Sequence, residues 1–211
     1  MNNFGSLLFN NHTIMKRLNI IYVLIVLLTI GSYPLFSQND SLASDKYLMV
    51  LDLQDFYLKN SLNIKEAETY INKVNDLIYK TKNENIIYIR SVHKVLNLSL
   101  KSPFIYVTLD TSAMQLYENL SIVNDNIFTK DEGNAFSVED LNVFLEKNNV
   151  KEIVIVGLMA EECIYKTSIG GIENGFEISI VPQAIIGKSP KSKEKIFNKL
   201  KSKGVRVQDY Y

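Results

Sequence analysis

Cysteine and histidine are scarce in this chain of 211 residues, and tryptophan is absent. The single cysteine, Cys163, has no partner for an internal disulfide, which excludes a disulfide-held scaffold. The two histidines, His12 and His93, are too few for a metal site built from several imidazoles. An excess of one charge is also lacking, because 23 basic residues balance 23 acidic ones. The composition therefore offers neither a basic field for nucleic acid nor an acidic tail.

A long apolar run is missing too, although a short one lies near the N-terminus. It extends from Leu18 to Ile30, follows the basic pair Lys16–Arg17 and precedes a small residue, Ser37. This layout is typical of a secretory signal peptide, and the run is shorter than the roughly 18 to 20 residues of a membrane-spanning helix. We expect residues 1–37 to be an extension and signal peptide that is cleaved on export to the periplasm or outside the cell. The alternative is an uncleaved N-terminal membrane anchor.

Residues 38–211 remain as one domain with enough chain for a substantial core. Without Lys16 and Arg17 this part carries 21 basic and 23 acidic residues. We expect a small molecule as its partner, no nucleic acid and no stable membrane association once the leader is removed. A lone thiol in an oxidising compartment is a liability, so Cys163 needs a reason to be there.

Strand-like and helix-like segments alternate along this domain. Such alternation predicts an α/β fold with a parallel sheet covered by helices on both faces. The pattern predicts strands in "KYLMVLD", "NIIYIRS", "NIFTK", "KEIVIVGL", "FEISIVPQ" and "VRVQ". It predicts helices over 63–84, over 137–149 with Ser137 as cap, over 163–175 and over 189–204. Between 92 and 126 the pattern is weak, with a strand at 104–110 and a short helix at 111–120 as the best interpretation.

Three chemically capable residues fall at or just past the ends of predicted strands: Asp52, Lys130 and Cys163. Parallel sheets bind ligands beyond the carboxyl ends of their strands, so the three should converge on one edge. A helix N-terminus and a nearby lysine favour a thiolate, and an aspartate can take the thiol proton. We expect the Cys163 thiolate to persist below the ordinary thiol pKa, with its proton shared with Asp52. Singly, each residue has a common structural explanation: a buried small side chain, a turn residue and a solvated lysine.

The segments "VLDLQDF", "FTKDEGNAF" and "VGLMAEECIYKTSIGGIENGFEISIVPQAI" resemble the isochorismatase-like cysteine hydrolase family, which includes nicotinamidases. The resemblance extends from about Tyr47 to Val207. It implies a three-layer α/β/α sandwich with a six-stranded parallel sheet and a catalytic triad of Asp52, Lys130 and Cys163. It also implies a cis peptide bond at Leu158–Met159 and an oxyanion hole formed by the backbone N–H groups of Met159 and Cys163. Homo-oligomers are common in the family.

Two departures from the family pattern bear on the substrate. Gln183 stands where relatives often have an aspartate, and the histidines of the nicotinamidase metal site have no counterpart beyond His93. We therefore expect no bound metal and no cofactor, and nicotinamide is a poor substrate candidate. Family enzymes that cleave isochorismate lack the cysteine, so Cys163 also argues against that reaction.

The sequence thus predicts an exported cysteine amidohydrolase that cleaves a small amide or related C–N bond through a thioester. Substrate-binding candidates are Phe56, Tyr57, Arg90 and His93. A catalytically silent binding or scaffold protein of the same fold is the alternative. A redox sensor lacks a resolving cysteine, and a Cys163–His93 pair has no supporting motif.

Overall fold

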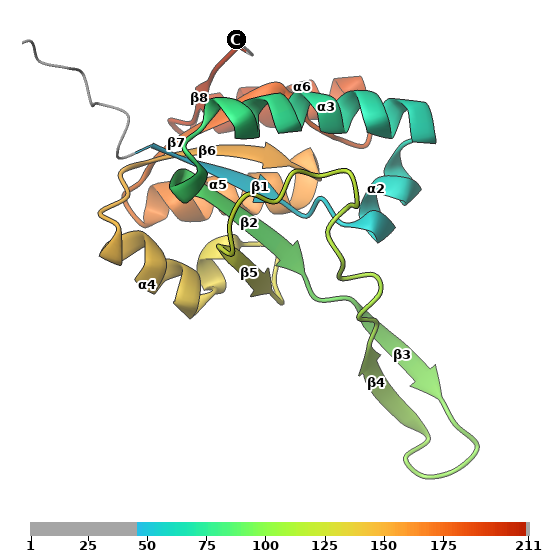
Figure 1. Cartoon of the computed structure of the whole chain (residues 1–211). Coiled ribbons are helices and arrows are strands. Elements are labelled where there is room, and N and C mark those ends of the chain that lie inside the picture. The colour runs from blue at the N-terminus through green and yellow to red at the C-terminus, as the bar shows by residue number, and fades with distance from the viewer. Residues whose placement is uncertain (1–45, 210–211) are drawn as a thin grey trace, which may run out of the picture. The chain divides into compact units, whose positions relative to one another are not determined.

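A six-stranded parallel sheet forms the centre of the computed structural model, which describes residues 46–209 (Figure 1). The two most central strands, β1 and β6, pair with each other and are almost wholly apolar. A strand that is covered on both faces needs such a continuous apolar run. The predicted sheet is confirmed. Its spatial order is β5 (Ile127–Lys130), β2 (Ile86–Ser91), β1 (Lys46–Leu51), β6 (Glu152–Gly157), β7 (Glu177–Ile185) and β8 (Arg206–Val207).

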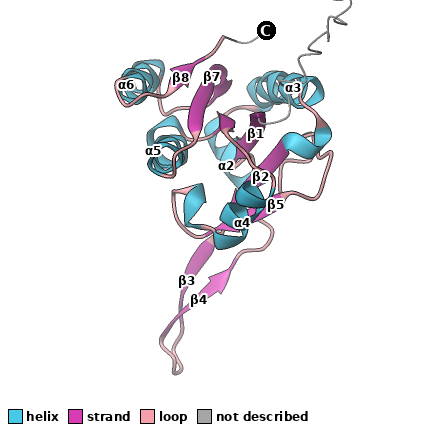
Figure 2. Ribbon diagram, turned by 90° about the vertical axis from the view of Figure 1, so that its left-hand side faces the viewer, coloured by secondary structure: helices cyan, strands magenta, loops and turns pink. Residues whose placement is uncertain are grey.

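Alternating side chains of the sheet build two separate cores, one on each face. Along β1, Met49 and Leu51 point into one core, and Leu48 and Val50 into the other. This alternation is the normal two-residue period of a strand. Helices α4 (Glu139–Lys147), α5 (Tyr165–Glu173) and α6 (Pro190–Lys201) cover the first face. Helices α2 (Asp55–Ser61) and α3 (Ile64–Lys80) cover the second, which completes the three layers (Figure 2).

The helix boundaries follow local capping chemistry. Asn63 and Glu66 form a reciprocal capping box at the start of α3, and Ser189 caps α6 ahead of Pro190. The predicted cap at Ser137 is wrong, because Ser137 closes a short 3-10 turn and donates its hydroxyl to the Asn134 carbonyl. Val138 occupies the N-cap of α4 instead. Helix α2 was not predicted, since its seven residues are too few to show a clear apolar period.

Segment 92–126 differs most from the sequence-based expectation. The predicted strand at 104–110 exists as β4 (Ile105–Leu109), but it pairs antiparallel with β3 (Lys94–Leu98) in a hairpin outside the main sheet. The predicted helix over 111–120 is wrong. That stretch folds as turns. The Gln54 side chain donates to the Ala113 carbonyl, and the Gln54 backbone forms a β-bridge with Leu116. Tyr117 and Leu120 are buried in the core beside α3.

Within residues 46–209 the helices are too short or too polar to cross a bilayer. The predicted signal peptide, residues 1–37, lies outside the described residues, as does His12.

Candidate active site

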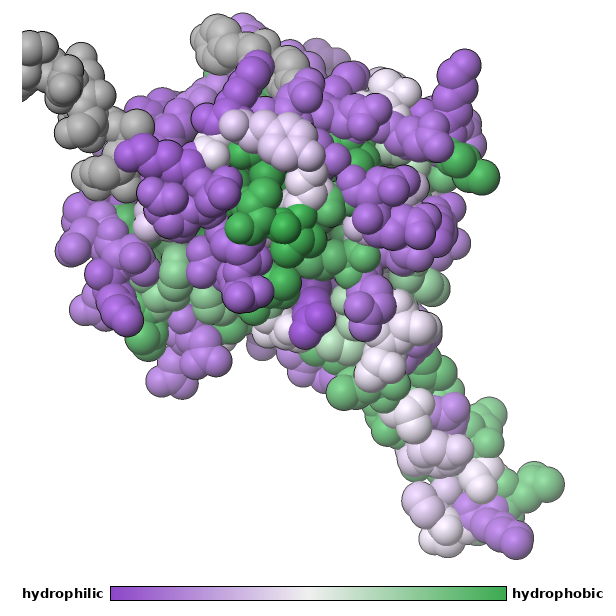
Figure 3. All heavy atoms as spheres, viewed as in Figure 1, coloured by the Kyte–Doolittle hydropathy of each residue, from purple (hydrophilic) through white to green (hydrophobic). Residues whose placement is uncertain are grey.

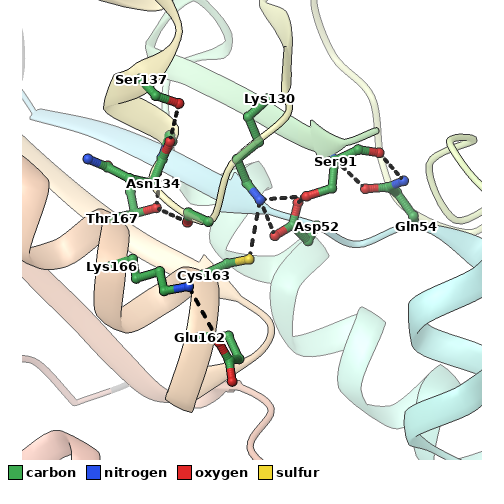
Figure 4. Close-up of polar contacts among 12 residues, drawn as sticks. Asp52, Gln54, Ser91, Lys130, Asn134, Ser137, Glu162, Cys163, Lys166 and Thr167 are labelled. Atoms are coloured by element: carbon green, nitrogen blue, oxygen red, sulfur yellow. Dashed lines mark hydrogen bonds and ion pairs between the residues drawn. The ribbon is translucent and has the colours of Figure 1, made fainter. Parts of the chain in front are cut away.

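Three elements carry the predicted catalytic residues to one edge of the sheet (Figure 4). Asp52 follows β1 directly, Lys130 is the last residue of β5, and Cys163 lies in a π-helical turn, Ala160–Ile164, between β6 and α5. Asp52 has a φ of 56°, a left-handed conformation that few residue types other than glycine adopt. Strained backbone and π-helical turns both concentrate at functional sites.

Lys130 connects the three side chains. Its Nζ lies 2.9 Å from Asp52 Oδ2 and 3.2 Å from Cys163 Sγ. The Lys130 and Asp52 side chains are 0% and 3% exposed, so this ion pair is shielded from water, whereas Cys163 is half-buried. Asp52, Lys130 and Cys163 are therefore brought together, with the sulfur as the accessible member.

Ser91 is a fourth member of the cluster that the sequence did not reveal. Its hydroxyl donates to Asp52 Oδ1 at 2.8 Å and accepts from Lys130 Nζ. Ser91 pairs with Lys130 in the register of β2 and β5, which places both side chains on the same face. A serine at a strand end is too common to single out, so only the strand register identifies it.

The buried Gln54 side chain fixes Ser91 in turn. Its Oε1 accepts from the Ser91 backbone N–H at 2.6 Å, and its Nε2 donates to the carbonyls of Ser91 and Ala113. The Gln54 side chain itself is fully buried, where leaving a polar group unpaired is costly. Gln54 therefore ties the end of β2 to the segment that returns from the hairpin.

The charges in the cluster act on Lys130 and Cys163 in different ways. Burial by itself lowers the pKa of Lys130, but the Asp52 carboxylate and the hydrogen bonds to Asp52 and Cys163, helped by the sulfur charge once the thiol ionises, outweigh it and raise that pKa. Burial, and then the Asp52 carboxylate, raise the pKa of the Cys163 thiol to about 11. The expected thiolate below the ordinary pKa is therefore wrong, because Lys130 does not offset desolvation and a neighbouring carboxylate. The direction of this shift favours a neutral thiol at rest.

The turn before Cys163 leaves backbone donors available. Gly157 has a φ of 123°, and the Leu158–Met159 peptide bond is cis, as the family resemblance implied. Ala160 donates its N–H to Ile186, and the N–H groups of Glu162 and Ile164 both donate to the Met159 carbonyl. The N–H of Met159 itself donates to no acceptor among residues 46–209. This N–H therefore has no hydrogen-bond partner within the described part of the chain.

Three of the four predicted substrate-binding residues form an aromatic group beside the cluster. The rings of Phe56 and His93 lie 4.3 Å apart, and Tyr57 meets His93 edge-on at 6.4 Å. Burial, followed by the charge of Asp52, raises the pKa of the Tyr57 hydroxyl, and Lys130 and Cys163 also act on it. The Tyr57 hydroxyl is therefore close enough to Asp52, Lys130 and Cys163 to be affected by their charges, and its ring contacts those of Phe56 and His93.

Arg90 and Gln183 lie elsewhere. Arg90 donates from Nε to Thr129 Oγ1 on β5. Since Ser91 faces the cluster, the preceding residue on β2 points to the other face of the sheet. Gln183 is exposed and lines a hollow of about 650 Å³ between the first turns of α3 and α6, whose lining includes none of the four cluster residues.

Comparison with known proteins gives this arrangement a family. The family model for the isochorismatase domain matches residues 46–210. The chain belongs to the isochorismatase family. One relative in that family is a secreted isochorismatase effector of Verticillium dahliae, 25% identical over 142 residues, which cover 67% of this chain and 72% of the relative. Another is the nicotinamidase of Saccharomyces cerevisiae, 22% identical over 78% of this chain and 99% of the enzyme.

Solved structures agree on the isochorismatase fold. A pyrazinamidase of Pyrococcus horikoshii in complex with zinc has a TM-score of 0.61 and 24% identity, and the match covers 79% of this chain and 99% of that one. An isochorismatase-like hydrolase from Alkaliphilus metalliredigens has a TM-score of 0.63 and 16% identity, with 79% and 95% covered. At these identities the likeness shows the fold.

The zinc of that pyrazinamidase complex raises the question of a metal in this isochorismatase-family chain. Beside the cluster, His93 Nδ1 lies 3.7 Å from Asp110 Oδ2. One imidazole and one carboxylate fall short of the three or four protein ligands that zinc takes. Among residues 46–209 no three His, Cys, Asp or Glu side chains gather in a way that suits a metal ion. The residues present do not fit a zinc site.

Proposed function

We propose that this chain is an exported cysteine hydrolase that cleaves a small amide or a related C–N bond through a thioester. The observation that carries the proposal is the buried Asp52–Lys130 ion pair in contact with the half-buried thiol of Cys163. Burying such an ion pair is costly. Its contact with the only thiol of the chain indicates that the pair serves the chemistry of that thiol.

Acylation begins with the neutral thiol. Asp52 accepts the proton from Cys163 as the sulfur attacks the carbonyl carbon, and Lys130 stays positively charged beside both groups because its pKa is raised. The carbonyl oxygen becomes an oxyanion that accepts hydrogen bonds from the backbone N–H groups of Met159 and Cys163. As the C–N bond breaks, Asp52 returns the proton to the departing nitrogen, and the acyl group stays on sulfur as a thioester.

Deacylation repeats the same proton movements with water. Asp52 takes a proton from the water as its oxygen attacks the thioester carbon, and the thiolate that leaves regains that proton. Ser91 keeps the Asp52 carboxylate in place through both steps by donating to Oδ1. The products are a carboxylic acid and ammonia or a small amine.

Substrate size follows from the surroundings of the sulfur. The Tyr57 hydroxyl is affected by the charges of the cluster, and the rings of Tyr57, Phe56 and His93 contact one another. These rings suit a small planar acyl group. One relative is the nicotinamidase of Saccharomyces cerevisiae, whose name denotes an amide-cleaving enzyme. Because the described residues do not fit a zinc site, we propose a metal-free reaction.

A panel of small amides, imides and ureas, scored for released ammonia, tests this function. We expect turnover of at least one compound in the presence of a strong chelator, and its complete loss in Cys163→Ser. Ser137→Ala, a surface change on the same face of the sheet, serves as the matched control. Turnover that disappears with chelation and returns with zinc would contradict the metal-free mechanism. A folded protein that is inactive on the whole panel would favour the silent binding protein.

A further inference from the structure

The hairpin β3–β4 is a two-stranded arm with one largely aliphatic face, on which Lys94, opposite Leu109 at the base, is the charged residue. In its register Leu96 lies opposite Val107, and Leu98 opposite Ile105. These four side chains and Leu109 share one face, and they are 55% to 80% exposed. The other face carries Asn97, whose amide donates to Thr108, together with Tyr106. Figure 3 shows hydrophobic side chains along the arm where it extends from the body of the domain.

Such a face is unusual on a domain that functions alone. An isolated two-stranded hairpin is marginally stable in water, and monomers rarely expose contiguous apolar patches beyond a few hundred Å². Leu100 and Phe104 at the tip add to the patch and are 100% and 64% exposed. Covering these seven side chains removes on the order of 500 Å² of apolar surface, which is most of the roughly 800 Å² per partner in a standard interface.

We propose that this face docks on the same face of a second copy of the chain, with the two arms antiparallel around a two-fold axis. Self-pairing suits the face because its centre holds no charged group. A two-fold contact also needs only one such patch, since each copy contributes the same surface.

Charge selects the antiparallel arrangement. Lys101 is the charged residue at the tip, while Asp110 and Asp131 lie at the base of the arm, where Asp131 pairs with Lys94. Parallel arms would bring the two Lys101 side chains together. Antiparallel arms place each Lys101 beside the base of the other copy, where the two carboxylates of Asp110 and Asp131 outnumber the one ammonium of Lys94. Each strand of five residues spans about 17 Å, so the tip of one arm reaches the base of the other, next to Phe56 and His93.

Sedimentation velocity on the full chain tests the contact. We expect a dimer for the unmodified protein, a monomer for Leu98→Asp/Ile105→Asp, and a dimer for the matched control Tyr106→Asp/Thr108→Asp on the opposite face. Unchanged thermal unfolding of the variants shows that the domain stays folded. A monomeric unmodified protein, or a dimer that survives the face variant, overturns the proposal. A monomer that binds vesicles of anionic lipid through the arm overturns it too, in favour of a membrane partner.

Cross-linking checks the direction of the arms independently of association strength. Val107→Cys lies near the middle of the arm, and we expect it to form an intermolecular disulfide across the two-fold axis. Leu100→Cys at the tip should not, because antiparallel tips lie far apart. The unmodified chain controls for Cys163. Efficient disulfide formation by Leu100→Cys, or none by Val107→Cys, overturns the antiparallel dimer.

Discussion

At the scale of single residues, the site depends on how one lysine is shared. Lys130 contacts Asp52, Ser91 and Cys163 at once, and its own side chain is fully buried. A buried ammonium with three partners cannot shift toward one of them without weakening its contact with the others. The small hydroxyl of Ser91 therefore holds Asp52 in place together with the lysine.

Removing that hydroxyl should slow catalysis without unfolding the protein. Ser91→Ala loses the bonds to Asp52 and Lys130, and a hydrogen bond to a charged group is worth about 1.5 to 3 kcal/mol. We expect kcat/KM to fall by about 10- to 100-fold. Ser91→Thr keeps a hydroxyl and should recover most of the rate, while Ser137→Ala should match the unmodified enzyme. Equal losses in the alanine and threonine variants would mean that Ser91 acts through packing.

The raised thiol pKa makes a prediction about pH. Only the thiolate reacts with iodoacetamide, so alkylation of Cys163 should be slow near neutral pH and should rise as pH approaches about 11. Asp52 raises this pKa and Lys130 lowers it. Asp52→Asn should therefore move the alkylation profile to lower pH, and Lys130→Met should move it to higher pH. A stopped-flow or mass-based pH series measures both, and a plateau already reached below pH 8 would contradict the neutral resting thiol.

At the scale of elements, the turn from β6 into α5 brings the nucleophile against β1. Gly157 makes the approach possible, since a Cβ there would lie 2.0 Å from the Leu51 carbonyl oxygen. Its φ of 123° would strain any other residue as well. The Tyr70 hydroxyl on α3 shares its one proton between the carbonyls of Ala184 at 2.9 Å and Gly157 at 3.2 Å, which anchors the same turn from the other face.

Two glycine substitutions separate crowding from strain. Gly157→Ala should lower the free energy of unfolding by about 3 kcal/mol or more, because the methyl group collides with backbone. Gly175 has a φ of 83°, and no atom lies within 4 Å of an added Cβ. Gly175→Ala should therefore lower the free energy of unfolding by about 1 to 2 kcal/mol through the left-handed conformation alone. Urea unfolding measures both. Equal losses would show that the Leu51 contact relaxes freely.

Elements also mark the limit of what the sequence reveals. The sequence predicted the apolar strands β1 and β6, because burial on both faces leaves a continuous apolar run. It also predicted the strand-end positions of Asp52, Lys130 and Cys163. The hairpin and the turns after it were not predicted. The turns depend on contacts between distant residues, such as Gln54 with Ala113, which leave no period in the local sequence, and the hairpin pairs its strands outside the main sheet. The thiol pKa was misjudged for a similar reason, since burial is a property of the fold.

At the scale of the whole molecule, export through the predicted leader is a testable prediction. Residues 1–37 have the layout of a signal peptide, and one relative is a secreted effector. We expect the protein recovered after export to begin just after Ser37, because a small residue suits the cleavage site. Intact-mass measurement checks this. A mass that still includes residues 15–37, in a membrane fraction, would indicate the anchored form.

The half-buried Cys163 is the sole sulfhydryl of the chain, and this gives a direct count of working molecules. Full labelling in denaturant reports the total protein, because every chain carries one reactive group. Labelling of the native enzyme by a slow substrate-like electrophile reports the fraction with an assembled centre. The ratio of the two converts any measured velocity into a turnover number per competent centre. A variant with a small fraction of fully active molecules can then be distinguished from one in which every molecule turns over slowly.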